Sequence, residues 1–156
     1  MTDLLVPLYR SWDVEWAAPP PAPEGVRVRP AMAYEKHRIV AWVRDGFGEG
    51  WASEADVAFG NRPISCFVAT VDGNLQGFAC YDATCRGFFG PLGVAEGARK
   101  RGIGRALLLA ALRAMACAGY AYAVVGGVDA PGFYVEAVGA VEIPGSTPGI
   151  YRDRLR

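Results

Sequence analysis

Residues 92–107 read Leu92-Gly93-Val94-Ala95-Glu96-Gly97-Ala98-Arg99-Lys100-Arg101-Gly102-Ile103-Gly104-Arg105-Ala106-Leu107. An apolar strand expected over residues 88–94 ends here, a loop rich in glycine and basic residues follows, and an apolar helix expected over residues 102–118 begins. The first N–H groups of a helix lack partners within it and carry the positive end of its dipole. Gly102 and Gly104 have no Cβ, so a bulky anion can approach their amides. The stretch therefore predicts a phosphate-binding turn between a strand and a helix.

The segments around this turn predict an α/β (α+β) fold, with a mixed, mostly antiparallel central sheet and helices on both faces. Asp72-Gly73 separates two apolar runs and indicates a hairpin. Ser53 is a candidate N-cap for a short helix. Expected strands cover residues 26–29, 65–71, 75–81, 88–94, 120–125, 140–143 and 150–151, and expected helices cover residues 34–47, 53–59, 102–118 and 133–138.

The N-terminal region differs in composition from the rest of the chain. Residues 1–17 form an apolar arm, residues 18–24 are a proline-rich connector that favours an extended chain, and residues 25–156 are the expected domain. The arm is too apolar to remain in water, so we expect it to pack on the domain or on a second subunit, giving a homodimer. Its large apolar side chains are Leu4, Leu5, Leu8, Trp12 and Trp16.

Composition narrows the classes of partner. Lys plus Arg and Asp plus Glu both number 16, so a formal net charge of zero gives no reason to expect nucleic acid or an anionic membrane. The apolar runs are too short to span a bilayer. The four cysteines form no C-x-x-C pair and the single histidine, His37, lies in a charged segment, so no metal site is expected. We expect a cytoplasmic protein with reduced thiols.

The glycines of the turn exclude two common phosphate motifs and match a third. No Gly-Lys-Ser/Thr closes a Walker A motif, and Leu107 occupies the third glycine position of G-x-G-x-x-G. Arg99, Gly102 and Gly104 fit Arg-x-x-Gly-x-Gly. With the preceding Leu-Gly-Val strand and the following Ala-Leu-Leu helix, the chain resembles the GNAT superfamily of N-acetyltransferases over about residues 25–151. The resemblance implies transfer of an acetyl group from acetyl-CoA to an amine, within a ternary complex and without a metal.

The resemblance also implies a cofactor site. In GNAT proteins the fourth and fifth strands splay apart, and the pantetheine arm lies in the gap, paired with the backbone of the fourth strand. Here Leu92 and Val94 would supply that backbone, and the Val94 N–H would polarise the thioester carbonyl. The diphosphate would rest on the amides from Arg99 to Arg105. The expected cofactor-binding residues are Leu92, Gly93, Val94, Arg99, Lys100, Arg101, Gly102, Ile103, Gly104, Arg105 and Ala106.

A second segment, residues 132–140, resembles the Phe-Tyr-x-x-x-Gly-Phe segment of many GNAT enzymes, in which the tyrosine protonates the departing thiolate. Tyr134 is the corresponding general acid. Gly139 lies one residue further from Tyr134 than in that pattern, and Ala140 replaces the aromatic residue. Either the helix holds an extra residue or Val135 takes the usual tyrosine position; a purely structural aromatic role for Tyr134 is the remaining alternative.

An acidic and aromatic segment precedes the hairpin, where GNAT enzymes build the acceptor pocket. Trp51, Glu49 and Glu54 are the expected substrate-binding residues, suited to a cationic amine, although a solvated helix end would have the same composition. Two other functions stay open. One is a non-catalytic acyl-CoA-binding or regulatory module, and the other is a nucleotide-binding α/β protein. Against the second, the turn follows a hairpin, whereas a dinucleotide-binding fold places it after the first strand.

Overall fold

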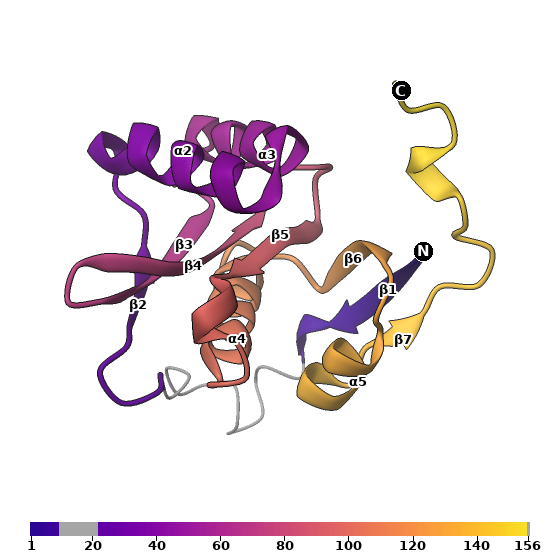
Figure 1. The fold of residues 1–156 in the computed structure, drawn as a ribbon. Coiled ribbons are helices and arrows are strands. Elements are labelled where there is room, and N and C mark those ends of the chain that lie inside the picture. The colour runs from indigo at the N-terminus through magenta and orange to yellow at the C-terminus, as the bar shows by residue number, and fades with distance from the viewer. Residues whose placement is uncertain (10–21, 156) are drawn as a thin grey trace.

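A computed structural model describes residues 1–9 and 22–155, and Figure 1 shows one sheet between two layers of helices. The sheet has seven strands in the order β2-β3-β4-β5-β6-β1-β7. The strands are β1 (Thr2–Pro7), β2 (Arg27–Pro30), β3 (Cys66–Val71), β4 (Asn74–Tyr81), β5 (Phe88–Val94), β6 (Tyr122–Val128) and β7 (Val141–Glu142). The helices are α2 (Lys36–Phe47), α3 (Glu49–Gly60), α4 (Ile103–Cys117) and α5 (Gly132–Val138), with short 3-10 turns η2 (Ala33–Glu35), η3 (Glu96–Ala98) and η4 (Gly149–Tyr151).

Each face of the sheet has its own core. On one face, α2 and α3 bury small and aromatic side chains against β3 and β4, among them Val43, Val68 and Phe78. On the other, the apolar helix α4 places Leu107 and Leu112 against the sheet, and α5 adds Val138. Antiparallel pairings join β2 to β3, β3 to β4 and β4 to β5, while β5 and β6 are parallel. The expected mixed α+β sheet with helices on both faces is confirmed.

The sheet opens between β5 and β6. These strands pair only at Phe88–Val124 and Phe89–Val125, although β5 continues to Val94 and β6 to Val128. Beyond Phe89 each strand keeps its other neighbour, so the two edges facing the gap are left without a strand partner. The predicted splaying of the fourth and fifth strands of the domain is thus present.

The N-terminal strand β1 lies between β6 and β7 and is antiparallel to both. Leu4 and Leu5 are the register partners of Val125 and Val124, and Leu4 is buried together with Leu8. These residues belong to the segment expected to form an arm, and they complete the sheet of their own chain. Trp12 and Trp16 lie outside the described residues.

Several element boundaries differ from expectation, most of them by one or two residues. The strand predicted at residues 150–151 is wrong: they belong to η4, and the sheet continues beyond β6 with β1 and β7. Strand β6 starts later and continues through Gly126 to Val128, supported by pairing with β1. Helix α3 begins at Glu49, directly after Gly48 with φ 94°, so Ser53 lies inside the helix and caps nothing. Strand β7 is confined to Val141–Glu142.

Candidate active site

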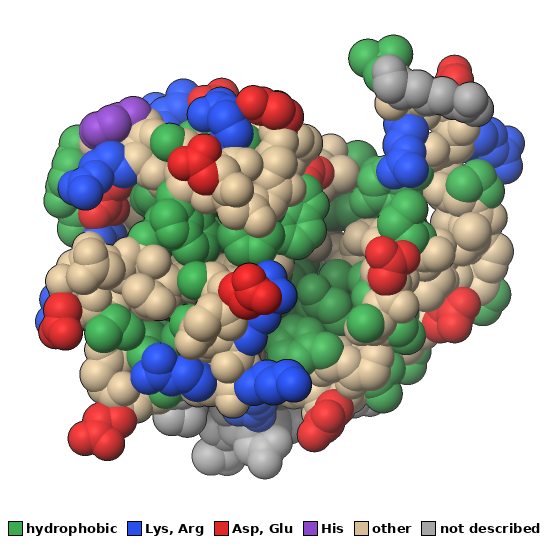
Figure 2. Space-filling view, viewed as in Figure 1, with side chains coloured by type: hydrophobic (Ala, Val, Ile, Leu, Met, Phe, Trp, Pro, Cys, Tyr) green, Lys and Arg blue, Asp and Glu red, His purple; other side chains and the backbone are tan. Residues whose placement is uncertain are grey.

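A cleft of about 750 Å³ occupies the gap between β5 and β6. Its walls come from β5, the start of α4, the end of β6, α5 and the side of α3. Figure 2 shows a hollow lined by green apolar side chains with blue basic side chains beside it. This volume is in the range of small-molecule sites.

The exposed edge of β5 presents backbone groups to the cleft. The Ala95 N–H donates a hydrogen bond of 2.8 Å to the Gln76 carbonyl on the β4 side. Backbone groups alternate in direction along a strand, so those of Leu92 and Val94 face the gap. Both residues line the cleft, and the Val94 carbonyl accepts a hydrogen bond from Nε of Arg99 at 3.2 Å. An extended ligand with amide groups could therefore add to this edge as a strand would.

The first turn of α4 is open beside the C-terminal end of β5. Its N-cap is Gly102 in a left-handed conformation (φ 83°), without a side-chain cap and without an acidic residue in the turn. A Cβ on Gly104 would make only ordinary contacts, 3.6 Å from Cγ2 of Val94 and 3.8 Å from Cζ of Phe133. The protein's own packing thus does not require glycine at this position. What the missing Cβ provides is access to the helix amides from the cleft, which fits an anion such as a diphosphate.

Seven of the eleven expected cofactor-binding residues line the cleft: Leu92, Val94, Arg99, Lys100, Gly102, Gly104 and Arg105. In the part of the chain that the structure describes, Arg99, Lys100 and Arg105 form no ion pair, so their charges are available to an anion. The other four residues lie outside the lining. Gly93 faces Phe47 and Phe78, Ile103 and Ala106 are on the buried face of α4, and Arg101 is exposed.

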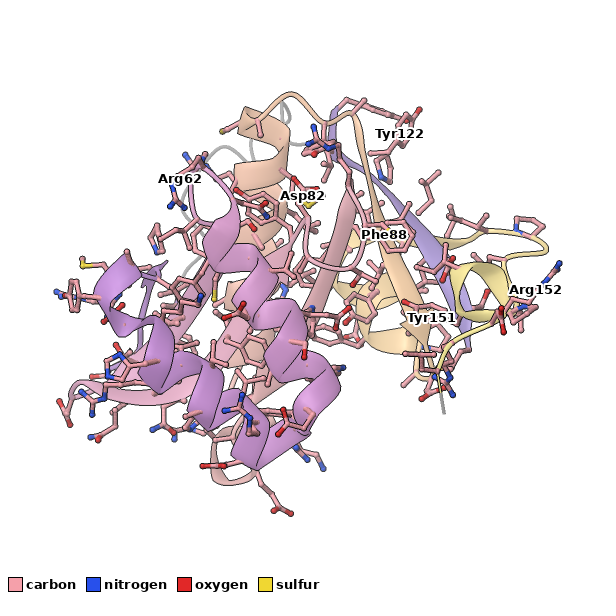
Figure 3. All side chains as sticks on the ribbon, turned by 90° about the horizontal axis from the view of Figure 1, so that it is seen from above. Arg62, Asp82, Phe88, Tyr122, Tyr151 and Arg152 are labelled. Atoms are coloured by element: carbon pink, nitrogen blue, oxygen red, sulfur yellow. The ribbon has the colours of Figure 1, made fainter. Side chains whose placement is uncertain are left out.

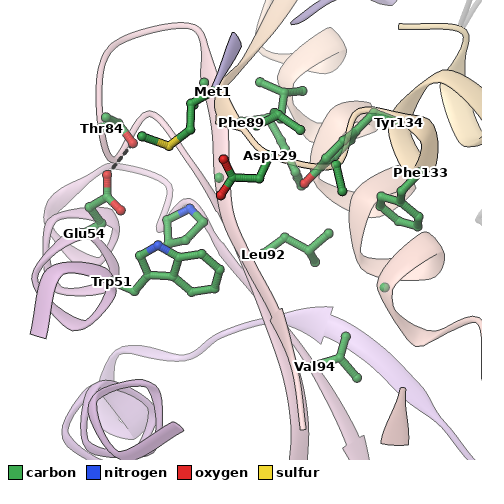
Figure 4. A pocket seen from close by; sticks show the side chains of 18 of the residues that line it. Met1, Trp51, Glu54, Thr84, Phe89, Leu92, Val94, Asp129, Phe133 and Tyr134 are labelled. Carbon is green, nitrogen blue, oxygen red and sulfur yellow. Dashed lines mark hydrogen bonds between the residues drawn. The ribbon is translucent and has the colours of Figure 1, made fainter. Parts of the chain in front are cut away.

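Tyr134 projects from α5 into the cleft. Its ring packs edge to face against Phe89 and Phe133, with centroids 6.3 Å and 5.0 Å away, and its hydroxyl points into the open space in Figure 4. Burial raises the pKa of Tyr134 to about 12, so the hydroxyl keeps its proton at neutral pH. Val135, the alternative position, is exposed and outside the lining. The helix ends at Val138, and Gly139 adopts φ 63° at its C-cap.

The far end of the cleft is aromatic and acidic. Trp51 and Glu54 line it from α3, and the Glu54 carboxylate accepts a hydrogen bond from the Thr84 hydroxyl (Figure 4). Trp51 is stacked on Phe47 with a centroid separation of 5.3 Å. Glu49 lies outside the lining, where Arg44 donates to its carboxylate at 3.0 Å. Two of the three expected substrate-binding residues are therefore brought together.

Among the cleft residues that sequence reasoning missed are the side chains of Thr84, Phe89, Asp129 and Tyr151. Phe89 and Asp129 adjoin the segments that were singled out, so extending those segments by a few residues would have found them. Thr84 and Tyr151 carry no local signal, because only the tertiary fold brings them to α3 and β6.

The model of the acetyltransferase (GNAT) family matches residues 34–139, which include β5, the turn at Gly102–Gly104 and Tyr134. The chain belongs to the GNAT family. No curated protein matches it in sequence.

Solved structures share the GNAT fold at low sequence identity. A GCN5-related N-acetyltransferase from Sphaerobacter thermophilus has a TM-score of 0.64 at 21% identity, covering 91% of this chain and 48% of its own. One from Kribbella flavida has a TM-score of 0.59 at 21% identity, covering 90% and 53%. A protein from Drosophila reaches a TM-score of 0.68 at 15% identity, covering 91% and 47%. This GNAT chain therefore spans about half the length of these three proteins.

A membrane-spanning helix and a cluster of metal ligands are both absent from the described residues of the GNAT domain. Among the helices of residues 1–9 and 22–155, none is both long and apolar enough to cross a bilayer. Across the same residues, no three His, Cys, Asp or Glu side chains are grouped as ligands for a metal ion.

Proposed function

We propose that this GNAT domain is an acetyl-CoA-dependent N-acetyltransferase in which an amine attacks the thioester directly within a ternary complex. The observation that carries the proposal is the open edge of β5. One end of this edge lies beside the first turn of α4, which is suited to binding a phosphate group, and the other end lies beside an acidic, aromatic pocket. A donor running along this edge would present its acyl group beside both Tyr134 and the acceptor pocket.

The chain's own groups fit the donor along its length. The amides of the first turn of α4, with Arg99, Lys100 and Arg105 around them, would hold the diphosphate. The backbone of Leu92 and Val94 would pair with the pantetheine, and a free N–H of this edge would polarise the acyl carbonyl as an oxyanion-hole donor does. Acetyl-CoA, when bound, supplies an acyl group activated as a thioester.

The acceptor must lose a proton before it can attack. An alkyl amine has a pKa near ~10 and is an ammonium ion at neutral pH. The Glu54 carboxylate would bind this cation beside the face of Trp51 and would take its proton, directly or through water. We leave Glu49 outside the proposed acceptor pocket, because it is exposed and paired with Arg44.

The leaving group needs a proton on the other side of the acyl carbon. The Tyr134 hydroxyl keeps its proton at neutral pH and points into the cleft, so it can donate that proton to the departing sulfur. Glu54 and Tyr134 thus divide proton removal and proton donation between two walls of one cleft.

Turnover tests the proposal. The protein is incubated with acetyl-CoA and a panel of alkyl, aromatic and amino-acid amines, and release of the CoA thiol is followed. Release that depends on an amine supports the enzyme. Stabilisation by acetyl-CoA without turnover of any amine would instead support a non-catalytic acyl-CoA-binding module, and competition by NAD would favour a nucleotide-binding protein.

A cytoplasmic location and a homodimer stay predictions. Leu4 and Leu8 are buried in their own chain, so they cannot supply a dimer contact. Sedimentation of the full chain measures the association state directly.

A further inference from the structure

We propose that Tyr151 forms the acceptor-side wall of the cleft, and that its hydroxyl binds the incoming amine and limits the width of the group attached to the nitrogen. The inference rests on the proposed acetyl transfer and names the acceptor class as slender, unbranched primary amines. Tyr151 lies on η4, 25 positions after Gly126 of β6, and lines the cleft together with Trp51 and Glu54.

The double glycine at the end of β6 is shaped around Tyr151. A Cβ on Gly126 would lie 2.8 Å from the Tyr151 hydroxyl oxygen and 2.8 Å from Cε2 of Phe88. A Cβ on Gly127 would lie 3.1 Å from Cε2 of Tyr151. Any larger side chain at Gly126 would displace an aromatic ring. Tyr151 thus packs on Gly126 and Gly127 where it lines the cleft, and Figure 3 labels it and Phe88.

Asp3 holds the C-terminal segment to this wall. Its carbonyl accepts a hydrogen bond from the Ile143 N–H at 2.9 Å, and its own N–H donates to the Ser146 hydroxyl at 2.9 Å. Oδ1 of its carboxylate accepts from the Gly127 N–H at 2.8 Å, while Oδ2 lies 3.3 Å from the position of a Cβ on Gly149. One buried residue of β1 therefore fixes both the end of β6 and the chain that carries Tyr151.

The Tyr151 hydroxyl is available to a ligand. Within residues 1–9 and 22–155 it makes no hydrogen bond. Partial burial raises the pKa of Tyr151, and the negative charges of Asp3 and Glu54 raise it further, so the hydroxyl is neutral at neutral pH. Glu54 and Tyr151 both line this cleft. An amine nitrogen between them could donate to both oxygens.

Two aromatic side chains bound the acceptor end of the cleft. Trp51 bounds the acceptor end from α3, and Tyr151 bounds it from η4. Trp51 packs against Phe47, and Tyr151 packs against Gly126 and Gly127. Neither ring can therefore move away from the cleft unless its neighbours repack. An unbranched alkyl chain fits a slot between two rings better than a branched or aryl group does.

The test measures KM and kcat for a series of n-alkylamines and for benzylamine, with Tyr151→Phe, Tyr151→Ala and the control Tyr122→Phe. Tyr122 is an exposed tyrosine at the start of β6. Its ring contacts Tyr9, away from the cleft. Tyr151→Phe should raise the KM of ethylamine about tenfold, the scale for losing one hydrogen bond to a charged partner, with the KM of acetyl-CoA and the melting temperature unchanged. Tyr151→Ala should raise kcat/KM for benzylamine relative to ethylamine about tenfold.

The outcomes separate the two proposals. Turnover by the wild-type protein with amine KM values and benzylamine preference unchanged in both Tyr151 variants would overturn this inference alone. A wild-type protein that acetylates no amine overturns the proposed function and this inference with it. If Tyr151→Ala does not fold, Tyr151→Phe decides, because it retains the ring that packs on Gly126.

Discussion

The Thr84 hydroxyl donates a hydrogen bond to Oε1 of the Glu54 carboxylate, joining the turn before β5 to helix α3 across 30 residues of sequence. This contact fixes the one acidic side chain that α3 contributes to the lining of the cleft. It also leaves the second carboxylate oxygen free for an amine. The position of Glu54 therefore depends on the packing of α3 against β5, and this makes Glu54 the first residue to test.

Glu54→Gln keeps the shape and the hydrogen bond from Thr84 but removes the base. We expect kcat at neutral pH to fall about a hundredfold, the lower end for loss of a general base. The loss should shrink as the pH approaches the pKa of the amine, because solution then supplies neutral amine. Glu49→Gln is the control, since Glu49 is exposed and paired with Arg44. Equal activity of both variants at pH 7 would mean that solvent, and not Glu54, removes the proton from the amine.

Tyr134→Phe keeps the ring and its packing against Phe89 and Phe133. The turnover number should fall about a hundredfold with little change in acetyl-CoA affinity, because only the proton donor is lost. The decrease in turnover number should be smaller with an acyl donor whose thiol is more acidic, because that leaving group needs less help from a proton donor. Adding Val135→Tyr should not restore activity, since Val135 lies outside the cleft. Full activity of Tyr134→Phe would reduce Tyr134 to a packing residue.

Tyr134 also predicts how stability depends on alkaline pH. The folded-state pKa of about 12 lies above the unfolded value of about 10, so burial of the neutral hydroxyl stabilises the fold below pH 10, and this contribution is lost as the pH rises from 10 to 12. The free energy of unfolding of the wild type should therefore fall by up to about 2–3 kcal/mol more than that of Tyr134→Phe over this range. Urea unfolding at pH 9 and pH 11.5 measures the difference. Tyr34→Phe, at a side chain 73% exposed, should show none.

Gly104→Asp places a carboxylate at the start of α4, where the diphosphate is proposed to bind. Acetyl-CoA at a hundred times its Kd should raise the melting temperature of the wild type by about 5–10 °C. This rise should vanish in the variant because the two negative charges repel. Gly50→Asp is the matched control: it lies in the first turn of α3, and no atom lies within 4 Å of its added Cβ. Normal stabilisation of Gly104→Asp by acetyl-CoA would place the phosphates elsewhere.

Gly93 was expected to contact the cofactor, and the structure gives it a packing role. A Cβ there would lie 2.7 Å from Cζ of Phe47 and 2.8 Å from Cε1 of Phe78. Gly93→Ala should therefore cost about 1–3 kcal/mol, the scale of overpacking, and lower the melting temperature by about 3–10 °C. Gly97→Ala, with no atom within 4 Å of the added Cβ, should change it little. Thermal denaturation without ligand measures both.

Local patterns in the sequence determined the hairpin, strand β5, helix α4 and the turn between the last two. The Asp72-Gly73 turn, the run of apolar residues in α4 and the glycines at 102 and 104 act through backbone conformation and short-range hydrogen bonds, so neighbouring residues suffice to predict them. The basic cluster followed from the same turn, and Tyr134 from the separate segment at residues 132–140.

Only the tertiary structure decided what lies on the other side of the cleft. Strand β1 pairs with β6 across at least 115 residues, in a segment that the sequence analysis did not predict as a strand, and residues 150–151 are not part of the sheet. Tyr151 consequently faces Gly126, and Thr84 reaches Glu54. Such contacts depend on which strand fills a place in the sheet, which is a competition between distant segments for the same hydrogen bonds and the same buried area. Local sequence patterns cannot predict the outcome of that competition, because they indicate only which structure each segment can form by itself.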